Sequence, residues 1–253
     1  MLTQESLRAL ATQYHTSEYP NIVREYFQHL FLTAFYKREA ATNLLFKGGT
    51  ALRIVYGSPR FSEDLDFSLF NIAAHERTAV IENLFQDTLA ELEQMGMHVS
   101  LGDKFGPTTD GYFGMANVQI YDYPPVTIEI NISNRNGRKV QGGVATIAND
   151  FVPTYNLFHL PQSDIVEEKV FSALLGRHKA RDFYDLYYIM RKGLLTNEHK
   201  ARLQNEKVQI LELVDSIRFD EELSALLPTD QQLIIKDFKR TLTAELERQL
   251  SGS

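Results

Sequence analysis

Two aspartates one residue apart, Asp64 and Asp66, lie inside an apolar stretch of the sequence. Leu65, Phe67 and Leu69 alternate with polar residues, which predicts a strand. Because side chains at positions i and i+2 of a strand project from the same face, the two carboxylates should lie close together. Like charges at that separation repel, and burial strengthens the repulsion. A divalent cation between them removes the conflict, and ligands that are all oxygen favour Mg²⁺ or Mn²⁺, which also bind substrate phosphates.

A glycine pair precedes this predicted strand, in the sequence Lys47-Gly48-Gly49-Thr50. Adjacent glycines let the backbone approach a ligand closely. The backbone N–H groups at the start of a following helix attract anions. A short D-x-D pattern alone is common and also fits a strand edge that faces water. The glycine turn therefore favours a phosphate site beside a metal site, which is what nucleotide chemistry requires.

A third acidic residue, Glu129, lies on a later predicted strand over 126–132, where it alternates with isoleucines. It shares the face opposite the isoleucines, so it could complete a metal cluster or act as a base. Taken by itself, the same pattern also fits an ordinary surface residue of a strand.

Periodicity predicts an α+β first part and a mostly helical second part. The predicted helices cover residues 21–40, 50–56, 78–95, 179–192 and 230–250, with one more after Asp164, and the predicted strands cover 64–69, 112–122 and 126–132. Gly96 is a candidate end of the third helix. Asp164, three residues before Glu167, predicts a capping box. We expect a first domain over 1–160 and a helical domain over 161–253.

Composition excludes several classes of protein. The 253 residues include no cysteine, so a disulfide framework, a thiolate metal site and a cysteine nucleophile are all ruled out. A net charge of −7 argues against a general nucleic-acid coat, although a local basic patch is compatible with it. The N-terminal segment lacks the pattern of a signal peptide, and no stretch is apolar enough for a membrane span. These features predict a cytoplasmic protein without a membrane partner.

Two motifs together carry a resemblance to a known family. Gly48-Gly49-Thr50, followed after a short helix by RFSEDLDFSL, closely resembles the nucleotidyltransferase signature of the polymerase-β-like fold. The later stretch EEKVFSALLGRHKARDFYDLYYI resembles the downstream motifs of the AbiEii/AbiGii toxin family. The resemblance spans residues 40–192. It implies a polymerase-β-like core with a mixed sheet and flanking helices, followed by a mostly helical part that completes the active site.

The resemblance also assigns roles to residues. It implies a nucleotide-binding turn at Lys47, Gly48, Gly49 and Thr50, metal ligands at Asp64, Asp66 and, least firmly, Glu129, a nucleotide-contacting Lys169, and a late catalytic aspartate at Asp182 or Asp185. Spacing alone does not separate the last two, because residues three apart share a helix face. Read without the family, Lys169 is a point charge able to reach a triphosphate, and the late aspartates fit a salt-bridged surface helix.

The implied reaction is a Mg²⁺- or Mn²⁺-dependent transfer of a nucleoside monophosphate from an NTP to an acceptor hydroxyl. The family implies a toxin restrained by a cognate antitoxin, with the 3′ end of tRNA as our expected acceptor. Basic residues that could contact RNA phosphates are Arg135, Arg138, Lys139, Arg177, Lys179 and Arg181.

Other functions remain compatible with the sequence. The same metal site would serve nucleotidylation of a protein or a small molecule. A metal-dependent glycosyltransferase also uses D-x-D, but a glycine pair ahead of the strand fits it less well. A non-catalytic nucleotide-binding or antitoxin-type module is the alternative without turnover, and the intact Asp64, Asp66 and Lys169 argue against it.

Overall fold

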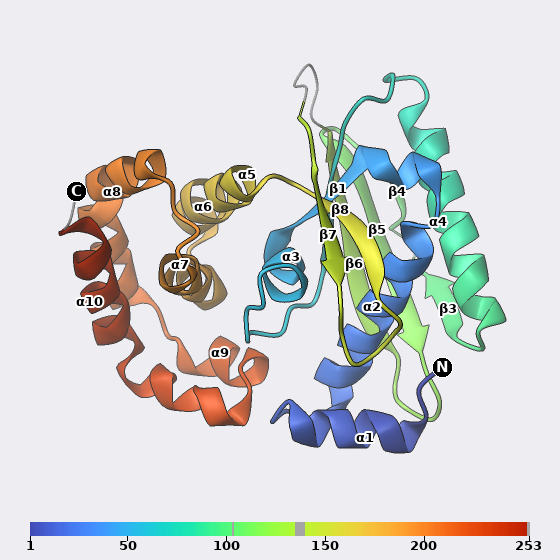
Figure 1. The fold of residues 1–253 in the computed structure, drawn as a ribbon, viewed down its shortest axis with the longest axis horizontal. Helices are drawn as coiled ribbons and strands as arrows, with labels where there is room; N and C mark the ends of the chain where they lie inside the picture. Colours follow the sequence, from blue (N-terminus) through green and yellow to red (C-terminus); the bar gives the residue numbers. More distant parts are fainter. Residues whose placement is uncertain (103, 135–139, 252–253) are drawn as a thin grey trace. The chain divides into compact units, whose positions relative to one another are not determined.

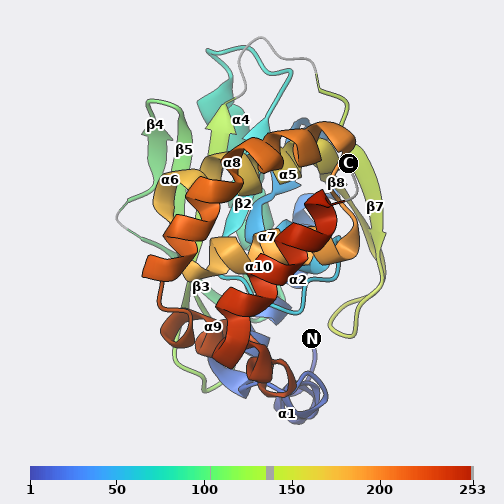
Figure 2. The ribbon, with the colours of Figure 1, turned by 90° about the vertical axis from the view of Figure 1, so that its left-hand side faces the viewer.

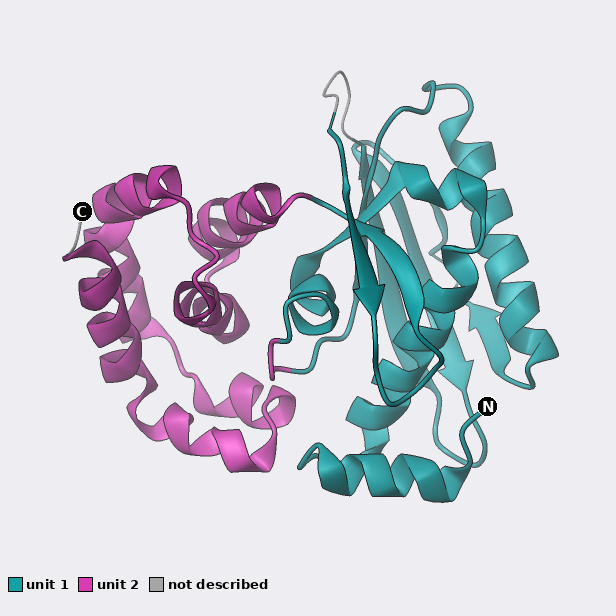
Figure 3. Cartoon of the chain, in the orientation of Figure 1, with its two compact units in different colours: residues 1–57, 61–160 teal, residues 58–60, 161–253 magenta. Residues whose placement is uncertain are grey.

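The structure is a computed structural model that describes residues 1–102, 104–134 and 140–251. The chain divides into two compact units (Figure 3). Unit 1 contains Met1–Gly57 and Phe61–Leu160, and unit 2 contains Ser58–Arg60 and Pro161–Ser253. The short segment Ser58–Arg60 therefore belongs with unit 2, although the chain on both sides of it belongs to unit 1.

Unit 1 is built on one mixed sheet, which has eight strands within the described residues. The strands are β1 (Leu44–Lys47), β2 (Leu65–Leu69), β3 (His98–Leu101), β4 (Gly106–Thr108), β5 (Gly111–Gln119), β6 (Val126–Asn134), β7 (Gly143–Ile147) and β8 (Tyr155–His159). Their order is β3-β5-β6-β2-β1-β8-β7, and β4 pairs with β5. β2 pairs in parallel with β6, and β1 in parallel with β8, while the other pairs are antiparallel. The strand that carries Asp66 is thus an interior strand.

The two faces of this sheet have different partners (Figure 1). One face packs against α2 (Val23–Phe35) and α4 (Arg77–Gln94), and α3 (Gly48–Ile54) packs against β1 and β2 on the other. On the first face, the Phe35 ring lies 5.2 Å from the Phe67 ring and 5.7 Å from the Phe85 ring. Alternation along β6 buries Val126, Ile128, Ile130 and Ile132 toward this core. The polar residues of β2 and β6 consequently face the α3 side.

The remaining helical segments of unit 1 are α1 (Gln4–Gln13), the π turn η1 (Glu18–Ile22) and the 3₁₀ turn η2 (Glu39–Asn43). α2 ends at Phe35, earlier than the predicted limit of 40. α4 ends as predicted beside Gly96, whose φ of +90° places it in the left-handed region that favours glycine.

From Gln162 onward, the regular secondary structure of the described part of unit 2 is helical (Figure 2). It contains α5 (Gln162–Val166), the π segment η3 (Glu167–Leu174), α6 (Leu175–Arg177), α7 (Ala180–Lys192), α8 (Asn197–Ser216), α9 (Asp220–Leu226), the 3₁₀ segment η4 (Thr229–Asp237) and α10 (Phe238–Leu250). Its core includes Phe183, Phe219 and Phe238, with ring centroids of the last two 4.8 Å apart. No described helix has the length and apolar character that crossing a membrane requires.

Two local predictions were wrong. Asp164 does not begin a capping box, because α5 starts directly after Pro161 and Asp164 already lies in its first turn. The single helix expected over 230–250 is instead η4 followed by α10. Between them, Asp237 has φ −119° and ψ 23°, which is not helical, and its carboxylate pairs with Arg240 in the first turn of α10. The chain therefore restarts there as a new helix.

Candidate nucleotide and metal site

The glycine turn lies directly against one of the two predicted metal ligands. Gly48 begins α3 with a φ of +80°. A Cβ atom built on Gly48 would lie 2.1 Å from Asp66 Oδ2. Both the backbone conformation and the space exclude a side chain at this position. The turn and the carboxylate can hold this contact only because residue 48 is glycine.

Hydrogen bonds and strand register fix the turn to the aspartate segment. Lys47, the last residue of β1, pairs with Asp66 across the antiparallel ladder. The buried Thr50 hydroxyl donates to the Asp64 carbonyl oxygen at 2.5 Å. Lys47 Nζ donates to Ser133 Oγ on β6 at 2.8 Å. The predicted residues Lys47, Gly48, Thr50, Asp64 and Asp66 are therefore gathered on one side of the sheet.

The two aspartates are partly exposed, and apolar neighbours anchor their segment. Asp64 lies just before β2 rather than inside it, and Asp66 lies within the strand. Leu65 and Phe67 are fully buried on the opposite face. That packing was predicted from the alternation and is confirmed. Accessible carboxylates beside a glycine turn fit a hard cation that shares its remaining coordination with phosphate oxygens.

Glu129 lies on the neighbouring strand β6 and is exposed. β2 and β6 are parallel, with Leu65 paired with Ile130 and Asp66 paired with Asn131. The residues one position earlier on the two chains are Asp64 and Glu129, so Glu129 lies beside Asp64. Among the described residues, however, no three acidic, histidine or cysteine side chains gather closely enough to hold a metal ion together. The third-ligand role of Glu129 stays a prediction.

In unit 2, Lys169 is paired with one of the two late aspartates. Lys169 Nζ lies 2.9 Å from Asp185 Oδ2, and Asp185 is fully buried on α7. Lys169 itself is 8% exposed and belongs to η3, a π segment, and such segments frequently occur at functional sites. Burial by itself would raise the pKa of Asp185, but the charges of Arg60 and Lys169 outweigh burial and hold that pKa below its usual value.

Asp182 has a different environment, although it lies on the same helix. It accepts two hydrogen bonds from Arg177, at 2.7 and 3.0 Å, and one from the Lys179 backbone N–H at the start of α7. Its buried carboxylate accepts a hydrogen bond from a backbone N–H group at the start of α7, and it does not contact Lys169. The structure thus brings Asp185, and not Asp182, together with Lys169.

The expected basic surface is only partly described. Arg135, Arg138 and Lys139 lie outside the described residues. Arg177 pairs with Asp182, and Arg181 lies 3.4 Å from Glu222. Lys179 is exposed. Two of the three described cations of this group therefore have their charge opposed by a neighbouring carboxylate.

Sequence reasoning overlooked Arg60, which is almost fully buried and grips Asp185 with two hydrogen bonds. The residue lies inside the RFSEDLDFSL motif, four positions before Asp64. The sequence offered one signal of its burial, which is that the arginine lies between a proline and a phenylalanine and shortly before an apolar strand. Only the fold reveals that its partner is 125 residues away.

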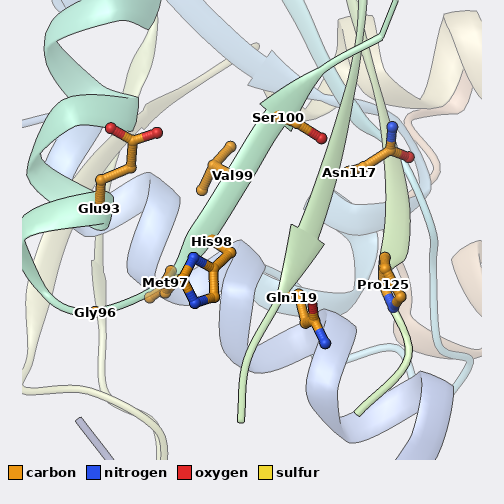
Figure 4. Close-up of a pocket in the computed structure, with 9 residues that line it drawn as sticks. All are labelled: Glu93, Gly96, Met97, His98, Val99, Ser100, Asn117, Gln119 and Pro125. Carbon is orange, nitrogen blue, oxygen red and sulfur yellow. The ribbon is translucent and has the colours of Figure 1, made fainter. Parts of the chain in front are cut away.

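A separate hollow of about 350 Å³ lies in unit 1 near the end of α4 and along β3 and β5 (Figure 4). It is lined by Glu93, Gly96, Met97, His98, Val99, Ser100, Asn117, Gln119 and Pro125. None of the predicted site residues lines it, so it is not the site that the motifs predict.

A mixed sheet whose glycine turn lies against paired carboxylates, followed by a helical unit with a buried lysine–aspartate pair, defines a protein of the nucleotidyltransferase class. Residues 30–252 match the model of the family described as nucleotidyl transferase AbiEii toxin, type IV TA system. The chain belongs to this AbiEii family of nucleotidyl transferase toxins.

Solved structures agree on the fold. A candidate nucleotidyltransferase from H. pylori aligns with a TM-score of 0.65 and 20% identity, covering 92% of this chain and 96% of that one. JHP933 from Helicobacter pylori aligns with a TM-score of 0.66 and 21% identity, covering 99% and 94% respectively. No curated protein matched the sequence. The α+β prediction, with a mixed sheet, flanking helices and a helical C-terminal part, is confirmed.

Proposed function

We propose that this nucleotidyltransferase uses Mg²⁺ or Mn²⁺ to transfer a nucleoside monophosphate from an NTP to the 3′ hydroxyl of tRNA. The observation that carries the proposal is the contact between the Gly48 backbone and the Asp66 carboxylate. This contact places a glycine backbone beside a carboxylate. Phosphates can approach the glycine backbone closely, and carboxylate oxygens are preferred ligands of divalent cations.

Within unit 1, Asp64 and Asp66 would hold the metal ion, with Glu129 as the candidate third ligand. The bound ion would supply positive charge that offsets the charge developing on the phosphates. Gly48, Gly49 and Thr50 would border the phosphates, with Lys47 beside them. The register between Lys47 and Asp66 keeps these groups at one place on the sheet.

Within unit 2, Lys169 would bind the triphosphate and Asp185 would hold its ammonium group in place, since the two are 2.9 Å apart. Arg60, which belongs to this cluster, is four residues from Asp64 in the sequence. The motif RFSEDLDFSL therefore contributes residues to both sets.

The proposed reaction needs little covalent chemistry from the protein. The acceptor oxygen forms a bond to the α-phosphorus as it loses its proton, and the bond between the α-phosphorus and the bridging oxygen breaks. Pyrophosphate leaves with that oxygen. Positioning of the phosphates and charge stabilisation supply most of the rate in such reactions.

Two considerations support tRNA as the acceptor. An RNA 3′ end supplies the hydroxyl that the reaction requires. The family consists of toxins, and blocking tRNA would stop translation. A cognate antitoxin would restrain this activity, which is the partner that a toxin–antitoxin family implies.

A protein or small-molecule acceptor is the second candidate, and a specific observation favours it. The chain carries a net charge of −7, and Arg177 and Arg181 are paired with carboxylates. An acidic protein whose arginines are paired in this way binds RNA phosphates less readily.

The acceptor is tested by incubating the protein with Mg²⁺, each labelled NTP in turn, and either purified tRNA or a tRNA-depleted lysate. We expect labelled tRNA of reduced mobility with at least one NTP, and binding that weakens steeply with salt. Label on a protein or metabolite only would assign the second candidate. Nucleotide binding without any pyrophosphate release would indicate a non-catalytic module.

A further inference from the structure

In unit 2, Asp185 contacts two cations in a buried charge cluster, and one of the two is Arg60. The residue is 2% exposed and Asp185 is fully buried. Arg60 Nε donates to Asp185 Oδ1 at 3.0 Å, and Arg60 Nη2 donates to Asp185 Oδ2 at 3.0 Å. Lys169 Nζ shares that second oxygen at 2.9 Å. Both carboxylate oxygens are therefore engaged by cations.

The cluster of Arg60, Asp185 and Lys169 contains two cations and one anion, so one positive charge is not balanced within it. Burying an ionic group is costly unless its geometry is well satisfied. A lone Asp185–Lys169 pair would be neutral, and the carboxylate would oppose any attraction of Lys169 for phosphate. With Arg60 present, the Asp185 charge is divided between two cations.

We propose that Arg60 is a positioning residue for NTP binding: it orients Asp185, which holds the Lys169 ammonium, and it keeps the cluster net positive toward the triphosphate. This inference rests on the proposed function, because it gives Lys169 the role of binding NTP. Arg60 acts through its neighbours and is not assigned a contact with the substrate.

Arginine suits this role better than lysine does. Its planar guanidinium presents two parallel N–H groups to one carboxylate, so it fixes the orientation of Asp185 as well as its charge. A lysine at the same place would keep the positive charge but would lose the pair of parallel hydrogen bonds to Asp185. Charge and orientation can thus be separated by mutation.

The experiment compares R60Q, the double variant R60Q/D185N and the control R248Q, measuring binding of each NTP with Mg²⁺ by calorimetry and kcat for the transfer reaction. R60Q makes the cluster neutral, and we expect NTP affinity to fall about tenfold. R60Q/D185N restores one net positive charge but leaves Lys169 without its carboxylate partner, so we expect affinity to recover to within about threefold of wild type while kcat stays about tenfold lower. R248Q removes the arginine of another arginine–carboxylate pair of unit 2, Arg248–Glu245 on α10, and should leave NTP affinity unchanged.

Wild-type affinity in R60Q, or a double variant no better than R60Q, would overturn the proposal. If R60Q does not fold, R60K decides: we expect near-normal NTP affinity with kcat lowered about tenfold, and unchanged kcat and KM would overturn it. Failure of the proposed function is distinguishable, because wild-type protein would then neither bind NTP nor transfer label.

Discussion

The two pairs of aspartates in this molecule are placed in opposite environments. Asp64 and Asp66 in unit 1 are partly exposed, and Asp66 faces the backbone of a glycine turn. Asp182 and Asp185 in unit 2 are fully buried, and arginines grip both of them with two hydrogen bonds each.

The difference shows how aspartate can serve either to bind a metal ion or to orient neighbouring cations. A buried carboxylate with two cationic partners already has its charge compensated, and its effect is to orient those partners. A carboxylate at the rim of a sheet beside a glycine can accept a ligand that arrives from solvent. We therefore assign metal binding to the unit 1 pair and orientation of Lys169 to Asp185.

The largest expected effect is at the exposed pair. Replacing Asp64 or Asp66 by alanine should lower transfer at least about a hundredfold, because each change removes a proposed metal ligand. The fold should persist, since charge repulsion is also relieved. Initial rates with the exposed-turn variant D122N as control check this, and retention of more than a few per cent of the activity would refute the metal assignment.

The glycine turn should be the next most sensitive feature. G48A forces a Cβ toward Asp66 Oδ2 and strains a residue with φ +80°, so we expect activity to fall about thirtyfold with a lower Tm. G106A is the matched control, because a Cβ there meets nothing within 4 Å. Equal activities of the two variants would show that the contact with Asp66 is not needed.

A smaller loss is expected at the lysine of the buried cluster. K169A and K169E should weaken NTP binding by about tenfold or more, because each removes or reverses the charge that we propose binds the phosphates. The exposed K179A variant controls for a general loss of positive charge. If calorimetry gave unchanged NTP affinity for both Lys169 variants, Lys169 would be only the structural partner of Asp185.

These contrasts bear on what the sequence could predict. The interval from Gly48 to Asp66, and the burial of Leu65 and Phe67, follow from local patterns that involve neighbouring residues only. Contacts between residues that are distant in the sequence do not follow from local patterns. Nothing in the pattern separates Asp182 from Asp185, and their difference arises because Arg177 is nearby in the chain while Arg60 arrives from a distant segment.

The missed elements have the same explanation. β1 has only four residues, so it offers too few positions for a period-two signal, and it is stabilised by pairing with β2 and β8. α8 buries only His199, Leu203, Ile210 and Val214 along 20 residues, which makes its apolar face sparse. Tertiary packing decides both elements, and a single sequence does not reveal that packing.

A buried histidine of unit 1 makes the stability of the fold depend on pH. His29 in unit 1 is stacked on Phe151 and bonded to the Tyr155 hydroxyl, and burial together with the Arg53 charge lowers its pKa to about 3. The folded state thus binds fewer protons than the unfolded state, so the stabilising contribution is present above about pH 6.5 and is lost as pH falls toward 3.

We expect the free energy of unfolding to drop by about 1 kcal/mol between pH 7 and pH 5.5 because of His29. The His29→Gln variant should show a flatter profile over that interval in urea titrations. Parallel profiles for the variant and the wild type would show that another group titrates there.

The smallest effect is expected at Glu129. E129Q should weaken Mn²⁺ binding about threefold, since the glutamate is exposed and lies one strand away from the aspartates. N131A, at the residue in register with Asp66, is the comparison. If only N131A weakened Mn²⁺ binding, measured by paramagnetic resonance, Glu129 would lose its assignment as the third ligand.

The central claim is that an NTP is cleaved between its α- and β-phosphates and that the unit 1 aspartates are required. It is tested most directly by supplying the same NTP labelled at either the α- or the γ-phosphate to wild type and D64N/D66N, with Mg²⁺, tRNA and lysate. We predict acceptor labelling from the α position only, pyrophosphate carrying the γ label, and neither product with the double variant. Acceptor labelling from the γ position, or undiminished labelling by D64N/D66N, would contradict the claim.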